Sequence, residues 1–212
     1  MRRVRGISAG FAKDMTMRVA FPLLAAAALC FGLGACSSAP PKPVYPDLRF
    51  DAQPPLRLDV AQIQIQNDFQ PTYRAPDVEH LFPVPPARAV ETWARDRLRA
   101  VGQNGIARFT IHNASVTQTD LKQTPGIAGA FTTEPSERYD MTVQVTLDIM
   151  DNTGRTVRTA NVTSTRSQSI LNNVTPNQRE QSWYDMTGDL MVDFDRRMTG
   201  EIRNSFGLYY VR

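Results

Sequence analysis

The sequence predicts an α+β domain: a two-layer sandwich in which an antiparallel four-stranded sheet carries two helices on one face, in the order β-α-β-β-β-α. Residues 138–149 alternate between polar and apolar side chains, as in a strand with one buried face. Two stretches, 87–101 and 183–202, place apolar residues at helical spacing. Strands and amphipathic helices in this order favour a sheet covered by helices.

The first half of the predicted domain contains one strand and one helix. Residues 56–65 alternate, but the apolar phase changes, which predicts a β-bulge near Ala61 and Gln62. A long polar and aromatic connection follows at 66–84. The helix begins at Pro85 or Pro86, where a missing backbone N–H is tolerated, runs to Val101 and ends at Gly102.

The second half contains three strands and the longer helix. A phase change between Ile111 and Ala114 interrupts the first of these strands, and the last strand is expected at an edge of the sheet because it is weakly apolar. Thr175, Pro176 and Gln178 predict a capping box at the start of the long helix. The predicted elements are strands at 107–118, 138–149 and 155–167, a hairpin turn at 151–154, a helix at 175–205 ended by Gly207, and a short packed tail at 208–211.

The chain opens with a segment typical of a secretory signal peptide, predicted at 1–35. Basic residues precede an apolar run at 19–31 that is too short to cross a bilayer, and small residues and Cys36 follow it. The sequence leaves open whether translation begins at Met1, Met15 or Met17.

Removal of the predicted signal segment changes the net charge of the chain, which bears on its possible partners. Residues 1–36 hold five basic residues and one acidic residue, so the formal net charge falls from +3 to −1 without them. We therefore expect no nucleic-acid partner. Cys30 would be removed with the signal, and Cys36 stands at the cleavage position, so the predicted domain has no disulfide and no cysteine-based metal site.

Residues 36–55 are predicted to form a proline-rich tether ahead of a single α+β domain at 56–212. Six of the nineteen residues from 37 to 55 are proline, and in polyproline II geometry they would extend up to about 60 Å. In the alternative reading, the apolar side chains of this segment fold back onto the domain. These are Val44, Tyr45, Leu48 and Phe50.

Candidate catalytic or metal-ligating residues are few. Asp77, Glu79 and His80 form the densest cluster, which His112 would complete as a general-base or metal site; the alternative is a solvated loop. A row of aspartates on the last helix could bind a divalent cation or a basic partner, or could simply form an exposed polar face favourable to the helix dipole. These are Asp185, Asp189 and Asp193. We predict no catalytic residues, no metal, no cofactor and no enzymatic activity.

The loop at 121–136 is longer than a hairpin requires and contains apolar side chains between glycines. Apolar residues on a flexible connection commonly contact a partner, a lipid or a ligand. Ile127 and Phe131 are therefore candidate contact residues. In the alternative reading, they cover one end of the core.

Leu33-Gly34-Ala35-Cys36 resembles the lipobox of bacterial lipoproteins. The resemblance implies diacylglycerol on the Cys36 thiol, cleavage before Cys36 and acylation of the new amine, as by palmitate. Ser37 after the cysteine suggests the outer membrane by the same resemblance. The order of elements also resembles the lipopolysaccharide-assembly lipoprotein and the auxiliary lipoproteins of ABC-type lipid transporters. The segments that carry this likeness are 87–101, 137–150, Gly154 and 197–202.

These resemblances imply a non-catalytic lipoprotein that is anchored in the outer membrane and faces the periplasm. We expect membrane lipid as a partner through acylated Cys36, and an envelope protein as a second partner. The expected role is that of an interaction or accessory subunit in cell-envelope assembly or lipid transport. The alternatives are a periplasmic lipid- or glycan-binding module and, less favoured, an envelope hydrolase.

Overall fold

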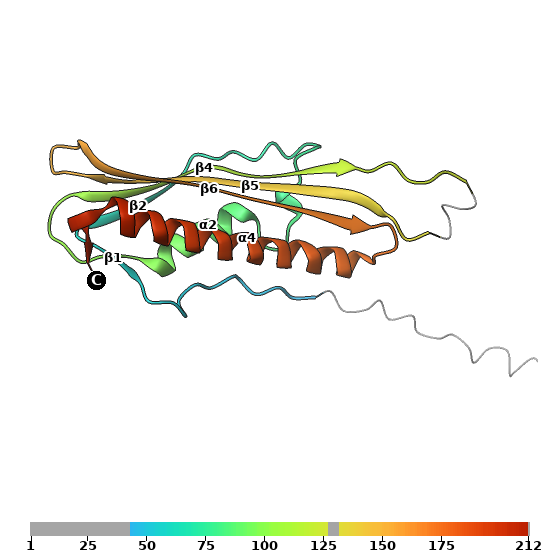
Figure 1. Ribbon diagram of the computed structural model, residues 1–212, viewed down its shortest axis with the longest axis horizontal. Helices are drawn as coiled ribbons and strands as arrows, with labels where there is room; N and C mark the ends of the chain where they lie inside the picture. Colours follow the sequence, from blue (N-terminus) through green and yellow to red (C-terminus); the bar gives the residue numbers. More distant parts are fainter. Residues whose placement is uncertain (1–42, 127–131, 212) are drawn as a thin grey trace, which may run out of the picture. The chain divides into compact units, whose positions relative to one another are not determined.

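The computed structural model describes residues 43–126 and 132–211 (Figure 1). The predicted signal segment, Cys36, Ile127 and Phe131 lie outside the described residues. Within the described residues, no helix has both the length and the apolar character that crossing a bilayer requires.

A four-stranded sheet with the order β2-β4-β5-β6 forms one layer of the domain. β4, β5 and β6 are antiparallel to their neighbours, as predicted, but β2 pairs in parallel with β4. The prediction of an entirely antiparallel sheet is therefore wrong at this edge, because a helix connects β2 to β4 and returns the chain to the same end of the sheet. The strands are β2 (Gln62–Asn67), β4 (Ile106–Asp120), β5 (Pro135–Met150) and β6 (Thr156–Leu171).

A second, three-stranded sheet with the order β3-β1-β7 was not predicted. The single strand expected at 56–65 is two strands in different sheets, and the change of apolar phase marks the break between them rather than a bulge. The chain turns at Val60, whose N–H donates to the Leu58 carbonyl at 2.9 Å. The predicted C-terminal tail packs as a strand against β1. The strands are β1 (Leu56–Leu58), β3 (Leu98–Ala100) and β7 (Tyr210–Val211).

The first helix, α2 (Pro86–Arg97), ends four residues earlier than predicted. The helix ends at Arg97 because the next residues, Leu98–Ala100, are extended and pair in parallel with β1. Gly102 does not end the helix; instead it allows two backbones to approach. A Cβ atom at this position would lie 2.7 Å from the Asp59 carbonyl carbon and the Val60 nitrogen.

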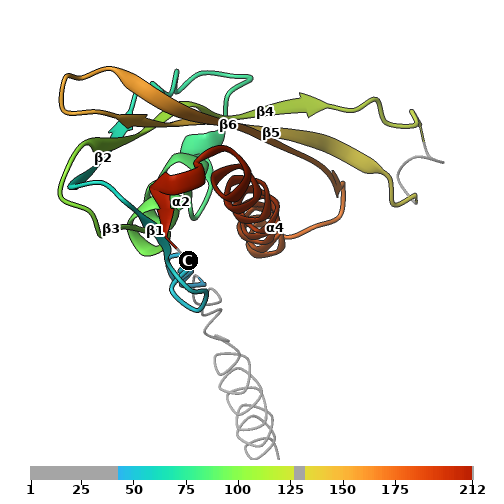
Figure 2. The same ribbon diagram turned by 60° about the vertical axis from the view of Figure 1, so that its left-hand side comes forward.

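The long helix, α4 (Pro176–Ser205), matches its prediction. The Thr175 hydroxyl accepts from the Gln178 N–H, and the Gln178 side chain accepts from the Thr175 N–H, which confirms the capping box. A 3₁₀ turn, η3 (Gly207–Tyr209), follows and leads into β7. Both helices lie on the same face of the four-stranded sheet (Figure 2), so the predicted two-layer arrangement holds.

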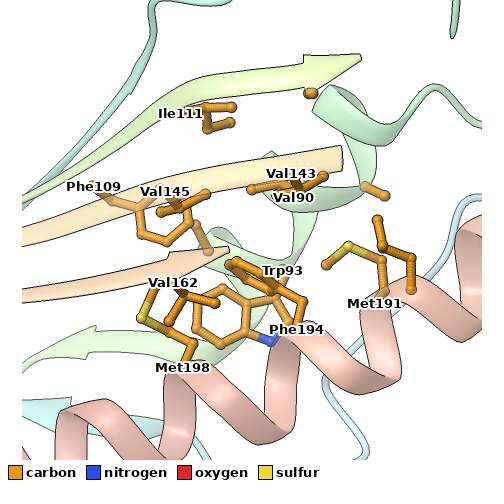
Figure 3. Packing of buried hydrophobic residues seen from close by; sticks show 14 of the residues in the cluster. Val90, Trp93, Phe109, Ile111, Val143, Val145, Val162, Met191, Phe194 and Met198 are labelled. Atoms are coloured by element: carbon orange, nitrogen blue, oxygen red, sulfur yellow. The ribbon is translucent and has the colours of Figure 1, made fainter. Parts of the chain in front are cut away.

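The hydrophobic core fills the space between this sheet and the helices. Trp93 of α2 packs edge-on against Phe194 of α4, with ring centroids 5.0 Å apart, and stacks near Phe109 of β4 at 5.8 Å (Figure 3). The alternating side chains of β5 point into the same core, as predicted. The predicted phase change in β4 is confirmed as a shift of register between Ile111 and Asn113, and β6 occupies an edge of the sheet, as expected.

Part of the segment preceding β1 packs against the domain. The rings of Tyr45 and Tyr184 lie 5.3 Å apart, and the Tyr45 hydroxyl donates to the carbonyl of Asn177 at 3.3 Å. Leu48 and Phe50 are partly buried against the core. The fold-back alternative therefore describes these three side chains, whereas Val44 is 92% exposed.

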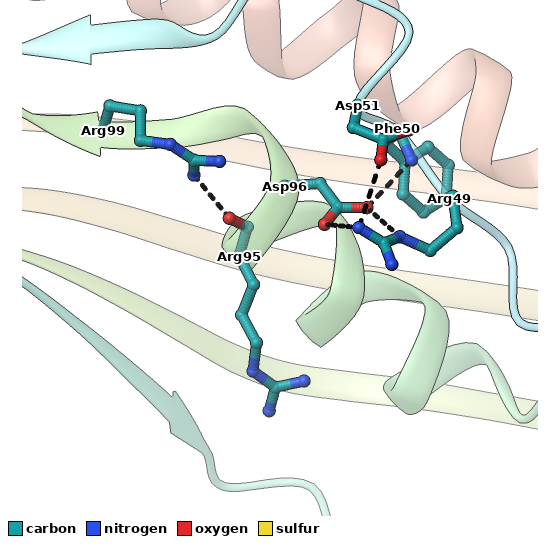
Figure 4. Close-up of polar contacts among 6 residues, drawn as sticks. All are labelled: Arg49, Phe50, Asp51, Arg95, Asp96 and Arg99. Carbon is teal, nitrogen blue, oxygen red and sulfur yellow. Dashed lines mark hydrogen bonds and ion pairs between the residues drawn. The ribbon is translucent and has the colours of Figure 1, made fainter.

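Asp96 of α2 fixes the same segment through polar contacts (Figure 4). The Arg49 guanidinium donates to the Asp96 carboxylate at 2.9 Å, and the Phe50 N–H donates to it at 3.0 Å. Burial alone would raise the pKa of Asp96, but these two hydrogen bonds and the Arg49 charge lower it below its ordinary value. The carboxylate is thus held charged where the segment meets the helix.

Candidate functional site

The base of the predicted contact loop is held by hydrogen bonds across its two sides. The Thr124 N–H and hydroxyl donate to the two carboxylate oxygens of Glu134 at 3.0 and 2.6 Å, and these bonds lower the pKa of Glu134. The Asn172 N–H donates to the Glu134 carbonyl at 2.9 Å. Residues 122–126 and 132–133 are exposed on this stem. The contact candidates Ile127 and Phe131 come between these two stretches.

Each of the three aspartates on α4 bonds to a different neighbouring side chain. Asp185 accepts from the Gln181 amide at 2.8 Å, Asp189 pairs with Arg166, and Asp193 pairs with Arg196. In the described ranges, no group of three or more His, Cys, Asp or Glu side chains is placed to hold a metal ion. The row of carboxylates therefore forms surface contacts with its neighbours, as in the polar-face reading.

The acidic and histidine residues predicted to form a cluster make separate contacts in the structure. Asp77 accepts from the Thr72 hydroxyl at 2.7 Å. His80 is exposed, and its ring lies 5.3 Å from the ring of Tyr73. His112 instead contacts the Thr146 hydroxyl, 2.9 Å from its Nε2, on the solvent face of the sheet. The predicted group of Asp77, Glu79, His80 and His112 is not formed.

Glu79 is the exception to the solvated-loop reading, because its side chain is buried. It lies in a 3₁₀ turn, η2 (Glu79–Leu81), and the residue is only 3% exposed. Its Oε2 accepts from the Val116 N–H of β4 at 3.3 Å, while its Oε1 has no hydrogen-bond partner among the described residues. A buried polar atom without a partner is unfavourable, and such atoms in native proteins call for an explanation.

A cavity of about 320 Å³ adjoins this carboxylate. It opens where the edge of β4 lacks a paired strand. The Asp68 N–H donates to the Ile111 carbonyl at 3.0 Å, and the next backbone bond from the connection joins the Val78 N–H to the Val116 carbonyl at 2.8 Å, which leaves Ala114 of β4 facing the cavity. The lining residues are Asn67, Phe69, Pro71, Tyr73, Glu79, His80, Pro85, Ala87 and Ala114.

Sequence reasoning identified Glu79 and His80 but missed the aromatic part of this cavity. Phe69 and Tyr73 lie in the connection at 66–84, where the apolar residues follow neither helical nor strand spacing. Tyr73 has a φ of 56°, in the left-handed region that non-glycine residues rarely adopt, and the residue is 67% exposed. The concentration of aromatic and proline residues in a long connection is the sequence signal that could have found it.

Comparisons with known proteins give no family for this chain. No family model matches it, and no curated protein matches its sequence. Three solved structures show weak likenesses. They are a minor lipoprotein from Acinetobacter baumannii (12% identity, TM-score 0.34, covering 73% of this chain and 98% of that chain), a neuraminyllactose-binding hemagglutinin homologue from Helicobacter pylori (8%, 0.35, 72% and 90%) and the rare lipoprotein B from Shewanella oneidensis (12%, 0.28, 64% and 94%).

Two of these three proteins are named as lipoproteins. TM-scores below 0.5 are too low to establish a shared fold, so neither the fold nor the function of this chain is inferred from them.

Proposed function

We propose that this chain is a lipid-anchored lipoprotein of the bacterial cell envelope, held at the outer membrane through acylated Cys36 and facing the periplasm. The support is in the sequence: a basic and apolar signal segment, the Leu33–Cys36 box, and Ser37 after the cysteine. A single acyl chain gives only marginal membrane binding, whereas the several chains of a bacterial lipoprotein give a durable anchor.

The folded domain acts, in this proposal, as a non-catalytic interaction or accessory subunit in envelope assembly or lipid transport. The observation that carries the proposal is the exposed stem formed by residues 122–126 and 132–133. Its base is fixed by bonds from Thr124 and Asn172 to Glu134, and the apolar residues Ile127 and Phe131 follow in sequence between its two sides. We propose that these two side chains contact an envelope protein.

The anchor is tested by the intact mass and membrane association of the purified protein. Wild type should carry the mass of acyl chains on a chain that begins at Cys36, and Cys36→Ser should remove both the acyl mass and the membrane association. Cys30→Ser is the matched control, because Cys30 lies within the removed segment. Acylation of the Cys36→Ser protein would contradict the assignment.

The contact surface is tested by photocrosslinking in cells, with a photoreactive residue in place of Phe131. A matched control places the same residue at Val192 of α4, an apolar side chain that is 67% exposed. A discrete protein adduct from position 131 alone supports the interaction role, and mass spectrometry then identifies the partner. Adducts that are absent from position 131, or equal at both positions, count against it.

A second role is favoured by a different observation, the cavity beside Glu79. A concave site with aromatic walls and one buried carboxylate is typical of ligand binding. This is compatible with a ligand-binding module as the alternative function, and the lining residues restrict the ligand further.

A further inference from the structure

The geometry points to a binding site for a primary ammonium group carried on an apolar stem, in the cavity lined by Glu79, Phe69 and Tyr73. This site is separate from the proposed contact surface at 121–136. It goes beyond the proposed function, since it would exist whether or not Ile127 and Phe131 contact a protein.

The first step of the argument is charge. The Glu79 carboxylate is buried, and among the described residues one of its oxygens, Oε2, accepts a hydrogen bond, from the Val116 N–H, while Oε1 accepts none. A buried carboxylate is costly unless a cation or further donors compensate it. An ammonium group supplies both a positive charge and N–H donors to Oε1.

The second step is the composition of the walls. Phe69 and Tyr73 bring aromatic rings to the cavity, and His80 lies beside Tyr73 with its ring centroid 5.3 Å away. Aromatic faces attract cations and also pack against hydrocarbon. The remaining apolar lining comes from Pro71, Pro85 and Ala87. The walls therefore suit a ligand that is charged at one end and apolar at the other.

The third step excludes other ligand classes. A ligand that places an anionic group against Glu79 would be repelled, and a neutral hydroxyl in the same place would leave the charge of Glu79 uncompensated. A guanidinium group prefers two carboxylate oxygens in a bidentate arrangement, whereas Oε2 of Glu79 already shares its lone pairs with the Val116 N–H at 3.3 Å. Oε1, which has no hydrogen-bond partner among the described residues, matches a point charge with rotatable donors, which is the chemistry of a primary ammonium.

Access to the carboxylate requires local motion. Oε1 is itself buried, so side chains lining the cavity must move apart for an ammonium to reach it. Tyr73 and His80 are both exposed and lie on the connection, which is tied to the edge of β4 at Ile111 and again at Val116. Rotation of exposed side chains between two fixed points opens the cavity without unfolding the sheet.

The test is a calorimetric titration of phenethylamine into the purified acylated protein in non-ionic detergent. The matched probe is 2-phenylethanol, which keeps the ring and replaces the ammonium by a neutral hydroxyl. Wild type should bind the amine at least tenfold more tightly than the alcohol. Glu79→Gln should remove this preference, and Asp77→Asn, two residues away and outside the lining, should keep it.

A second variant guards against misfolding of the Glu79→Gln protein. Ala87→Leu fills the cavity from the first turn of α2 and leaves Glu79 in place, and it should weaken amine binding by tenfold or more. Equal affinity for the amine and the alcohol in wild type, or full amine binding by a folded Glu79→Gln protein, would overturn the proposal.

The same experiment separates two sources of the ammonium group. Phosphatidylethanolamine is added to the micelles, with phosphatidylglycerol as the control lipid. A fall in phenethylamine affinity with phosphatidylethanolamine alone assigns the site to a lipid headgroup. Unchanged affinity with both lipids assigns it to a soluble amine.

Discussion

At the scale of single residues, two glycines show how the same residue type serves opposite purposes. Gly102 lies where the chain passes against the turn at Asp59 and Val60, and its N–H donates to the Val60 carbonyl at 3.0 Å. Gly200 lies within α4, and apart from the adjacent backbone of its own helix, no atom of the described residues stands within 4 Å of where its Cβ would be. The first glycine is required by space, whereas the second only adds conformational freedom to the unfolded chain.

We therefore predict opposite effects from the same substitution. Gly102→Ala should lower the free energy of unfolding by about 1–3 kcal/mol, because the new Cβ would collide with backbone atoms 2.7 Å away. Gly200→Ala should raise it by about 0.5–1 kcal/mol through helix propensity. Urea denaturation of the two variants beside wild type measures both. A loss of stability in Gly200→Ala would contradict the open space at this position of the helix.

At the scale of elements, predictions succeeded where the signal is local. The bounds of α4 follow from a capping box and an apolar stripe, and the strand β5 follows from the twelve alternating residues at 138–149. The strands β1, β3 and β7 have two or three residues each, too few to show a period, and their pairing depends on segments far apart in the chain. The same reason explains why the sequence indicated a solvated loop at Glu79. The side chain is buried through a contact with Val116, 37 positions away, which the local sequence does not show.

The turn between β5 and β6 is an element that the sequence did specify. Asp151-Asn152-Thr153-Gly154 closes it, with Gly154 at a φ of 82° and its N–H donating to the Asp151 carbonyl at 2.9 Å. The Asp151 carboxylate accepts from the Thr153 hydroxyl at 2.6 Å and from the Arg155 N–H at 3.1 Å. These hydrogen bonds lower the pKa of Asp151 to about 2.

This turn should make hairpin stability depend on pH in the acid range. The folded pKa of Asp151 lies below the ordinary value of about 3.9, so its contribution is complete above about pH 5 and is lost progressively as the pH falls toward 2. Asp151→Asn should therefore destabilise the protein near neutral pH, and the difference from wild type should shrink near pH 2. Urea midpoints at pH 6 and pH 2.5 test this; a difference that stays constant across the range would refute the assignment.

At the scale of the whole molecule, one buried arginine joins three parts of the fold. Arg97, at the end of α2, donates from Nε to the Asp195 carboxylate of α4 at 2.8 Å, and also donates to the Pro54 carbonyl ahead of β1. Trp93 donates to the same Asp195 oxygen at 2.8 Å. Arg97 is 3% exposed, so its removal would leave Asp195 without its cation in a partly buried place.

Arg97→Ala should lower the free energy of unfolding by about 3 kcal/mol or more, because breaking a buried ion pair leaves the partner charge uncompensated. Arg95→Ala, two residues earlier, is the control: Arg95 is 59% exposed and pairs with Glu91 on its own helix, so the change should stay within about 0.5 kcal/mol. Chemical denaturation of both variants provides the comparison. Similar losses in the two would mean that the Arg97 pair does not join the helices.

The docking of residues 45–50 has a mechanical consequence. Tension that enters the domain from the N-terminal side reaches Tyr45 and the Arg49–Asp96 contact before it reaches β1. These contacts break one at a time, whereas β1 is held by hydrogen bonds to two neighbouring strands. Under load, residues 45–53 would therefore peel away first, as far as the bond from the buried Arg97 to the Pro54 carbonyl, and release about 30 Å of chain. If the chain is anchored through Cys36 as proposed, the domain can yield to stretching of the envelope while its core stays folded.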